Sequence, residues 1–169
     1  MGISPYLKAI RDRIGHDLIM LPAVTVLIWD DDGRLLLVRG DDTGTWQTVG
    51  GAVEPDETPE DAARREAAEE TGLEVALTGI RGVLGGPRFH HTYPNGDRVA
   101  FVSTMFDARI VSGEPRPDGD ETTEVAWLTP AELEAGRRHA PASTADEALP
   151  RLLRAILADA GIAAATPAS

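Results

Sequence analysis

The spacing of apolar and polar residues predicts alternating strands and helices. Apolar and β-branched residues fill 21–29 (LPAVTVLIW), and the acidic run Asp30 to Gly33 that follows is typical of a hairpin turn, so a returning strand is predicted at 35–38. The segment 85–97 (GGPRFHHTYPNGD) is polar and rich in turn-forming residues, which predicts a loop. Further strands are expected at 45–49, 73–84, 98–111 and 124–128.

Helices are predicted where a capping residue precedes a proline and apolar residues then recur at helical spacing. Ser4 and Thr58 are the expected N-caps of two helices, because each stands directly before a proline. The second of these helices should end at Gly72, since glycine is the usual residue after a helix C-terminus. A short helix is expected from Thr129. The last helix is expected at 145–160, with an apolar face of Leu149, Leu152, Leu153, Ile156 and Leu157.

This order of elements predicts an α+β fold, with helices packed on a mixed sheet. Strands precede, interrupt and follow the few helices, and no repeat or linker divides the chain. A chain of 169 residues fits one domain, which at this size buries roughly 70% of its unfolded surface. We expect a helical N-terminal extension at 1–17, the main domain at 18–160 and a C-terminal tail at 161–169.

Composition narrows the possible functions. Lys and Arg number 16 against 28 Asp and Glu, a formal net charge of −12, which disfavours binding to a nucleic acid backbone. An acidic enzyme that acts on phosphates would need a metal cation to offset its own charge. With no cysteine, disulfides, thiolate metal sites and thiol nucleophiles are excluded, and a cytoplasmic location is expected. The longest apolar stretch, 18–29, is too short for a membrane span and contains Pro22.

The segment 51–73 (GAVEPDETPEDAARREAAEETGL) places three carboxylates on one predicted helix. Glu66 and Glu70 are four residues apart and Glu66 and Glu69 are three apart, so their Cβ atoms are about 5–6 Å apart. At an effective dielectric of 20, each pair would repel by about 3 kcal/mol. Because oxygen ligands of this kind suit hard divalent cations, Mg²⁺ or Mn²⁺ is the expected cofactor.

The same segment resembles the Nudix box, G-x5-E-x7-R-E-U-x-E-E-x-G-U, where U is apolar. The seven fixed positions are filled by Gly51, Glu57, Arg65, Glu66, Glu69, Glu70 and Gly72. Seven such residues at fixed spacing arise by chance at roughly 1 in 10⁸ per start point. The preceding GTWQTVGG also resembles the family's approach to the box, although Val49 stands where proline is usual.

The resemblance implies a Nudix fold, a mixed sheet sandwiched between helices, and a metal-dependent hydrolase of a nucleoside diphosphate linked to a moiety X. It implies that the metal ligands are the Gly50 carbonyl and the carboxylates of Glu66, Glu69 and Glu70. It also implies that Arg65 pairs with a box carboxylate, Glu57 being the candidate, and so holds the catalytic helix against its loop.

A further acid often comes from a late loop in this family. Glu121 lies six residues before Trp127, a placement similar to that of family members whose late glutamate binds metal or acts as the base. By this resemblance, the group that orients or deprotonates the water is one of Glu66, Glu69 and Glu70, or Glu121; Glu69, Glu70 and Glu121 are the catalytic candidates. Asp118, Asp120 and Glu124 lie in the same segment, which could instead be an ordinary acidic surface loop.

Candidate substrate-binding residues are aromatic or cationic, because rings stack on bases and arginine pairs with phosphate. They are Arg39, Trp46, Arg88, His90 and Tyr93, with His91 and Arg98 beside them. Trp46 could equally be a core residue, and Tyr93 could belong to a simple turn. The YPNGD segment at 93–97 resembles one bacterial group of Nudix proteins.

Two other functions of this family fit the sequence less well. A non-catalytic Nudix module that senses a nucleotide would be expected to lose box glutamates, whereas this chain keeps all of them. Isomerase chemistry on a prenyl diphosphate requires a catalytic cysteine in that branch of the family, and this chain has none. The expected partner is a small nucleotide, with a homodimer possible in principle. The sequence does not choose between ADP-ribose, sugar nucleotides, dinucleoside polyphosphates, CDP-alcohols and damaged nucleoside triphosphates.

Overall fold

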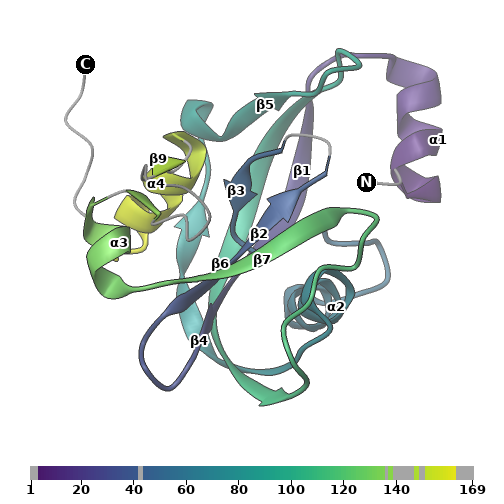
Figure 1. The fold of residues 1–169 in the computed structure, drawn as a ribbon. Coiled ribbons are helices and arrows are strands. Elements are labelled where there is room, and N and C mark those ends of the chain that lie inside the picture. The colour runs from purple at the N-terminus through teal and green to yellow at the C-terminus, as the bar shows by residue number, and fades with distance from the viewer. Residues whose placement is uncertain (1–3, 42–43, 136, 139–146, 149–150, 163–169) are drawn as a thin grey trace.

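The computed structural model describes residues 4–41, 44–135, 137–138, 147–148 and 151–162 (Figure 1). Its helices are α1 (Pro5–Ile14), α2 (Pro59–Thr71), α3 (Pro130–Ala135) and α4 (Arg151–Asp159), with a 3₁₀ turn, η1, at Pro87–Phe89. Its strands are β1 (Ile19–Trp29), β2 (Leu35–Gly40), β3 (Trp46–Gln47), β4 (Glu74–Leu84), β5 (His90–Thr92), β6 (Arg98–Ser112), β7 (Thr122–Leu128), β8 (Arg137–Arg138) and β9 (Glu147–Ala148).

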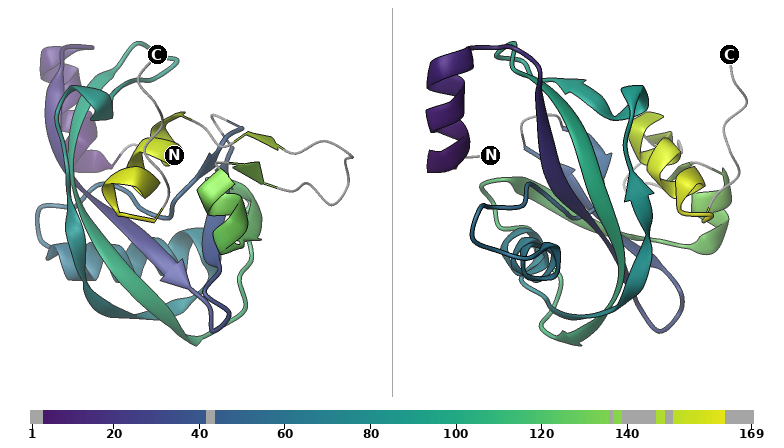
Figure 2. Two further views of the ribbon diagram at one scale, coloured as in Figure 1. Left: turned by 90° about the vertical axis from the view of Figure 1, so that its left-hand side faces the viewer. Right: turned by 180° about the vertical axis from the view of Figure 1, so that it is seen from behind.

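One mixed sheet organises the chain. Its strand order is β3-β2-β1-β6-β4, with β5 paired to β6 and β7 paired to β2. The central strands β1 and β6 run parallel along the whole of β1, and the other pairs are antiparallel. Both α1 and α2 lie on one side of the sheet, and α3 and α4 lie on the other (Figure 2). The predicted α+β sandwich is therefore confirmed.

Two apolar clusters, one on each face, hold these layers together. The cluster under α2 includes Val24, Val26 and the three alanines of the helix, and the cluster under α3 and α4 includes Leu27, Leu153 and other large side chains. Because β1 is buried on both faces, its sequence is a nearly continuous apolar run.

The predicted caps of the box helix are present. Thr58 Oγ1 accepts a hydrogen bond from the Asp61 amide at 3.2 Å, and Gly72 adopts the left-handed conformation with φ +69°. Ser4 likewise caps α1 by accepting from the Leu7 amide at 3.2 Å. Local sequence therefore defined both helix starts correctly.

Two predicted segments differ from the structure. The expected loop at 85–97 contains η1 and β5, because the start of the long strand β6 provides a pairing edge for His90–Thr92. The last helix begins at Arg151 rather than at 145, and Glu147–Ala148 instead pairs with β8. Since proline favours the first turn of a helix, Pro150 marks a better helix start than Ala145. Leu149 lies outside the described residues, as does the Leu152 side chain.

The domain boundaries at 17 and 160 stay predictions, and residues 163–169 lie outside the described part of the chain. Within that part, no helix is both long enough and apolar enough to cross a membrane.

The chain between β6 and β7 passes close to the end of α2, which sets a steric test of the fold. A Cβ on Gly113 (φ +98°) would lie 2.7 Å from the Gly72 carbonyl oxygen, whereas one on Gly119 (φ +80°) would meet nothing within 4 Å. Both Gly→Ala changes add backbone strain, but only Gly113→Ala adds a clash with backbone. We expect Gly113→Ala to lower the free energy of unfolding by about 2–4 kcal/mol and Gly119→Ala by about 1 kcal/mol, measured by denaturant titration. Equal losses would contradict this packing.

Candidate functional site

The box loop is fixed to the central strand of the sheet by backbone hydrogen bonds. The amide of Val24 donates to the Gly51 carbonyl at 2.9 Å, and the amide of Val53 donates to the Pro22 carbonyl at 3.1 Å. The loop thus runs beside β1 before it enters α2. This arrangement anchors the loop to the most buried part of the molecule.

Alanines set the orientation of α2. Ala62, Ala63 and Ala67 are fully buried against the sheet, and their small side chains let the helix approach it closely. Successive helical residues are about 100° apart, so the acidic residues divide between the edge of this face and the open side. Glu66 and Glu70 are 6% and 1% exposed, whereas the Glu69 side chain is 58% exposed.

Two glycines make room for the buried carboxylates. The Gly50 amide donates to Glu70 Oε2 at 3.2 Å, and Gly50 has a positive φ of +149°. A Cβ on Gly50 would collide with the Val24 carbonyl, and one on Gly51 would collide with the Glu66 carboxylate. A side chain at Gly50 would therefore displace the backbone of β1, and a side chain at Gly51 would displace the carboxylate of Glu66.

Arg65 uses all five of its N–H donors, three toward the loop and two toward carboxylates of its own helix. Its Nη2 and Nε reach Glu57 Oε1 and Oε2 at 2.7 and 3.1 Å. Its Nη1 donates to Glu66 Oε1 at 2.8 Å and to Glu69 Oε2 at 2.9 Å, and Nη2 also donates to the Ala52 carbonyl at 3.1 Å. The pairing of Arg65 with Glu57 agrees with the expectation from the box.

These contacts shift the titration of both partners. Hydrogen bonds from Arg65 lower the pKa of Glu57, outweighing the effect of burial, and those from Glu57 raise the pKa of Arg65 further. Arg65 thus acts as the counter-charge for three carboxylates. Within the described ranges, no three acidic or histidine side chains converge as a ready-made metal cluster.

Burial raises the pKa of both buried glutamates. Burial is the main cause that raises the pKa of Glu70 to about 9, with the negative charges of Glu66 and Glu121 adding to it and the Gly50 amide opposing it. Burial also raises the pKa of Glu66, although Arg65 opposes that rise. A bound cation would reverse this shift, because it stabilises the charged carboxylates.

The loop before β7 brings a further acid to α2. The negative charge of Glu121 contributes to raising the pKa of both Glu66 and Glu70, so the loop brings this acid toward the buried pair. Thr122, fully buried, donates its hydroxyl to the Glu70 carbonyl at 3.0 Å and so attaches the loop to the helix.

Asp118 organises this loop rather than standing free within it. Its Oδ1 accepts hydrogen bonds from the amides of residues 120–122, at 2.8 to 3.0 Å. Those amides lower its pKa despite the opposing effect of burial. Sequence reasoning did not assign this role to Asp118, nor the role of Thr122. The Asp118-Gly119 pair is the signal that could have revealed it, because an aspartate at the start of a turn accepts hydrogen bonds from the amides that follow.

Two of the predicted substrate residues lie together on β2 and β3. Arg39 pairs with Glu124 at 3.0 Å, and its guanidinium lies 5.8 Å from the centre of the Trp46 ring. Trp46 is only 1% exposed and belongs to the core cluster under α3 and α4. The prediction that Trp46 stacks on a base is therefore corrected: its ring presents no open face.

The other predicted substrate residues are not gathered around the carboxylates. Arg88 pairs with Asp159 of α4 at 2.8 Å, on the side of the sheet opposite to α2. His90 is exposed on β5, and Tyr93 packs edge-on against His91 with ring centres 4.6 Å apart.

Comparisons with known proteins agree with this geometry. The NUDIX domain model matches residues 20–152. A MutT-like protein from Streptomyces ambofaciens is 39% identical over 111 residues, 66% of this chain and 65% of that protein. An RNA pyrophosphohydrolase from Pseudomonas putida is 45% identical over 108 residues, 60% of this chain and 68% of that protein. The crystal structure of a MutT NUDIX hydrolase from Burkholderia pseudomallei has a TM-score of 0.60 and 25% identity, covering 83% of this chain and 98% of that chain.

The chain therefore spans slightly less than two thirds of the length of the Streptomyces relative. The family match covers most of the chain, and the structure brings the box residues together between loop and helix. On these grounds the chain belongs to the NUDIX domain family.

Proposed function

We propose that the chain hydrolyses the diphosphate linkage of a nucleoside diphosphate joined to a moiety X, with the help of a divalent metal ion. The observation that carries this proposal is the pair of buried carboxylates, Glu66 and Glu70, beneath two glycines and next to Glu121. Buried acids with so few hydrogen-bond donors are costly for a fold that has no use for them. They are suited to hold a cation that in turn holds phosphates.

The residues fit Mg²⁺ or Mn²⁺. Glu66, Glu69 and Glu70, together with the Gly50 carbonyl, supply oxygen ligands of the kind these ions prefer. When bound, the ion would polarise a phosphoryl oxygen and lower the pKa of a coordinated water. Glu70, buried and otherwise driven toward its neutral form, has the strongest need for such a charge.

We assign the remaining catalytic and positioning roles from where each side chain lies. One of Glu69, Glu70 and Glu121 orients the attacking water and accepts its proton, and Arg65 positions α2 against the loop through Glu57 and Ala52. Hydrolysis of a pyrophosphate bond is supported by the name of the Pseudomonas relative, an RNA pyrophosphohydrolase, and the small-molecule substrate stays a prediction. The absence of nucleic acid binding, the homodimer and the cytoplasmic location stay predictions.

The second candidate function is a module that binds a nucleotide without hydrolysing it. A turnover assay distinguishes this sensor from the proposed hydrolase. We expect one or more members of a panel of ADP-ribose, sugar nucleotides, dinucleoside polyphosphates, CDP-alcohols and oxidised nucleoside triphosphates to be cleaved with Mg²⁺ or Mn²⁺. Product is measured as nucleoside monophosphate or phosphate. The ion should also raise the melting temperature, since it binds the folded state. Full turnover in excess EDTA would contradict metal dependence, and binding without turnover across the panel would favour the sensor.

Glu70→Gln tests the buried carboxylate. We expect kcat to fall by about 10²-fold or more, the usual cost of a lost transition-state electrostatic contact. The control Glu60→Gln removes the same charge from an exposed position on the same helix and should leave kcat unchanged. Wild-type turnover by Glu70→Gln would rule out this role.

In EDTA, Glu70→Gln should also change how the free energy of unfolding depends on pH. Because the folded pKa of Glu70, about 9, lies above its ordinary value of 4.5, this carboxyl contributes stability that is complete below pH 4.5. That contribution is lost as the pH rises toward 9. Glu70→Gln should therefore lose less stability than the wild type over this interval, as followed by denaturant titration.

Arg65→Ala tests the link between loop and helix. The change leaves the largely buried carboxylates of Glu57 and Glu66 without their cation, so we expect a loss of unfolding free energy of about 2 kcal/mol or more. The neighbouring Arg64 is 52% exposed and makes one surface ion pair with Asp61, so Arg64→Ala should cost less than about 0.5 kcal/mol. Similar melting curves for the two variants would show that Arg65 does not carry the link.

A further inference from the structure

A cavity of about 320 Å³ lies between α1, the start of β1 and the box loop. Tyr6 and Leu7 of α1 form one wall, Met20 and Pro22 of β1 form the floor, and the box loop closes the side nearest α2. Its volume is at the lower end of ligand pockets, which suits one ring system rather than a whole nucleotide. Neither the box nor the proposed roles above account for this cavity.

The wall formed by α1 is held firmly in place. Arg11, only 8% exposed, donates to the carbonyls of Gly15, Asp17 and Arg98 at 3.1, 2.7 and 2.9 Å. Three carbonyl acceptors on a buried guanidinium fix the end of the helix to the start of β6.

The YPNGD turn at 93–97 attaches the end of α1 to the sheet a second time. Asp97 accepts from His16 Nδ1 at 2.8 Å and lies 3.7 Å from Arg11 Nε. Asn95 donates to the same carboxylate at 2.9 Å, which orients it toward the helix. This turn therefore positions α1, and through it the wall of the cavity, although it lies far from the box in sequence.

The lining of the cavity selects an uncharged group. Apart from Ser4, Glu54 and Glu57 it is apolar, and within the described part of the chain no Lys or Arg lines it. The two charged residues that line it are both acidic, so a phosphate or carboxylate would be repelled. Tyr6 and Met20 are 53% and 70% exposed and offer a ring and a thioether to a flat partner.

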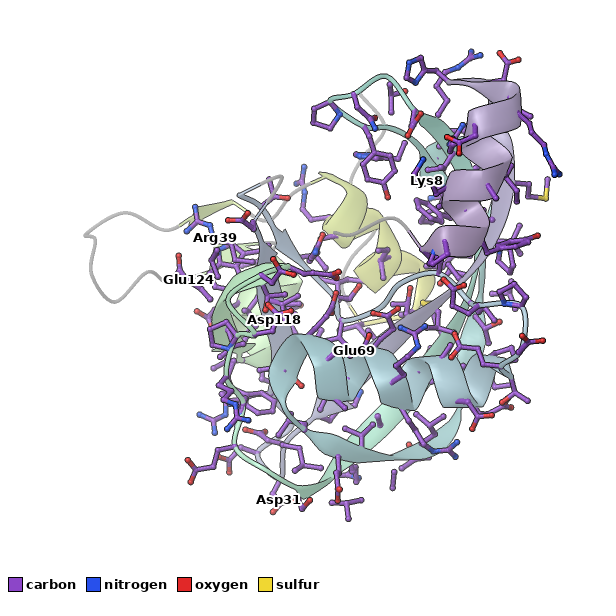
Figure 3. The ribbon with its side chains drawn as sticks, turned by 90° about the vertical axis from the view of Figure 1, so that its right-hand side faces the viewer. Lys8, Asp31, Arg39, Glu69, Asp118 and Glu124 are labelled. Carbon is purple, nitrogen blue, oxygen red and sulfur yellow. The ribbon has the colours of Figure 1, made fainter. Side chains whose placement is uncertain are left out.

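One residue of the cavity wall, Glu57, also belongs to the hydrogen-bond network of the box. Glu57 lines the cavity and at the same time binds Arg65, whose Nη1 reaches Glu66 and Glu69. Figure 3 shows Glu69 above α2, on the side where α1 lies. Through Glu57 the cavity therefore borders the loop that Arg65 ties to the acidic helix.

We propose that the cavity beneath α1 binds the nucleobase of the substrate, with Tyr6 and Met20 as its contact residues. This assignment rests on the proposed function, since it assumes a nucleotide whose diphosphate lies at the box carboxylates. It makes the N-terminal helix part of substrate binding, and it makes Asp97 a positioning residue for that helix.

Binding of non-hydrolysable analogues tests the assignment. The ligands are the α,β-methylene analogues of ADP, GDP, CDP and UDP, with methylenediphosphonate as the ligand that lacks a base, each titrated calorimetrically in Mg²⁺. The wild type should bind one or more nucleotide analogues at least tenfold more tightly than methylenediphosphonate. The double variant Tyr6→Ala/Met20→Ala should reduce that advantage by about tenfold, as expected for lost base stacking, and leave methylenediphosphonate binding unchanged.

The control is Ile80→Ala/Val83→Ala on β4, two apolar residues that are 63% and 65% exposed and lie outside the cavity. It should match the wild type with every ligand, and melting curves verify that both double variants are folded. If Tyr6→Ala/Met20→Ala keeps the nucleotide advantage, or if the wild type shows none while still binding methylenediphosphonate, the cavity assignment is wrong and the diphosphate site stands. If neither ligand class binds, the proposed function fails and the assignment fails with it.

Discussion

The interaction on which the site depends is the one that Arg65 makes with its five N–H donors. A single guanidinium joins the box loop, through Glu57 and the Ala52 carbonyl, to two carboxylates of its own helix. Lysine could not do this, since it has three donors and no planar fork. The loop on one side of this link carries the two glycines, and the helix on the other carries the acids, so the link determines how they face one another.

Around this link, negative side chains outnumber positive ones. One cation faces Glu57, Glu66 and Glu69, while Glu70 has the Gly50 amide and negative neighbours. Such an arrangement lowers stability, because burial penalises the charged carboxylates, and the cation of the proposed function would relieve that penalty. The rest of the domain can carry that cost through its two apolar clusters and the central strand β1, which is buried on both faces.

Features encoded by neighbouring residues were predictable from the sequence. Thr58, Pro59 and Gly72 set both ends of α2, and the three-and-four spacing of Glu66, Glu69 and Glu70 requires only a helix to bring them near one another. The box and the pairing of Arg65 with Glu57 follow from residues within one short segment. These contacts span few residues, so local conformation alone decides them.

Only the tertiary structure decided which distant residues meet. Glu121 joins Glu66 and Glu70 because the loop before β7 is attached to the end of α2, and Trp46 is buried because α3 and α4 cover its face of the sheet. The cavity beneath α1 exists because Arg11 reaches Asp97 and the start of β6. The sequence by itself determined the helix, its caps and its acids. Their surroundings depend on strand order and on the packing of whole layers, which local periodicity does not encode.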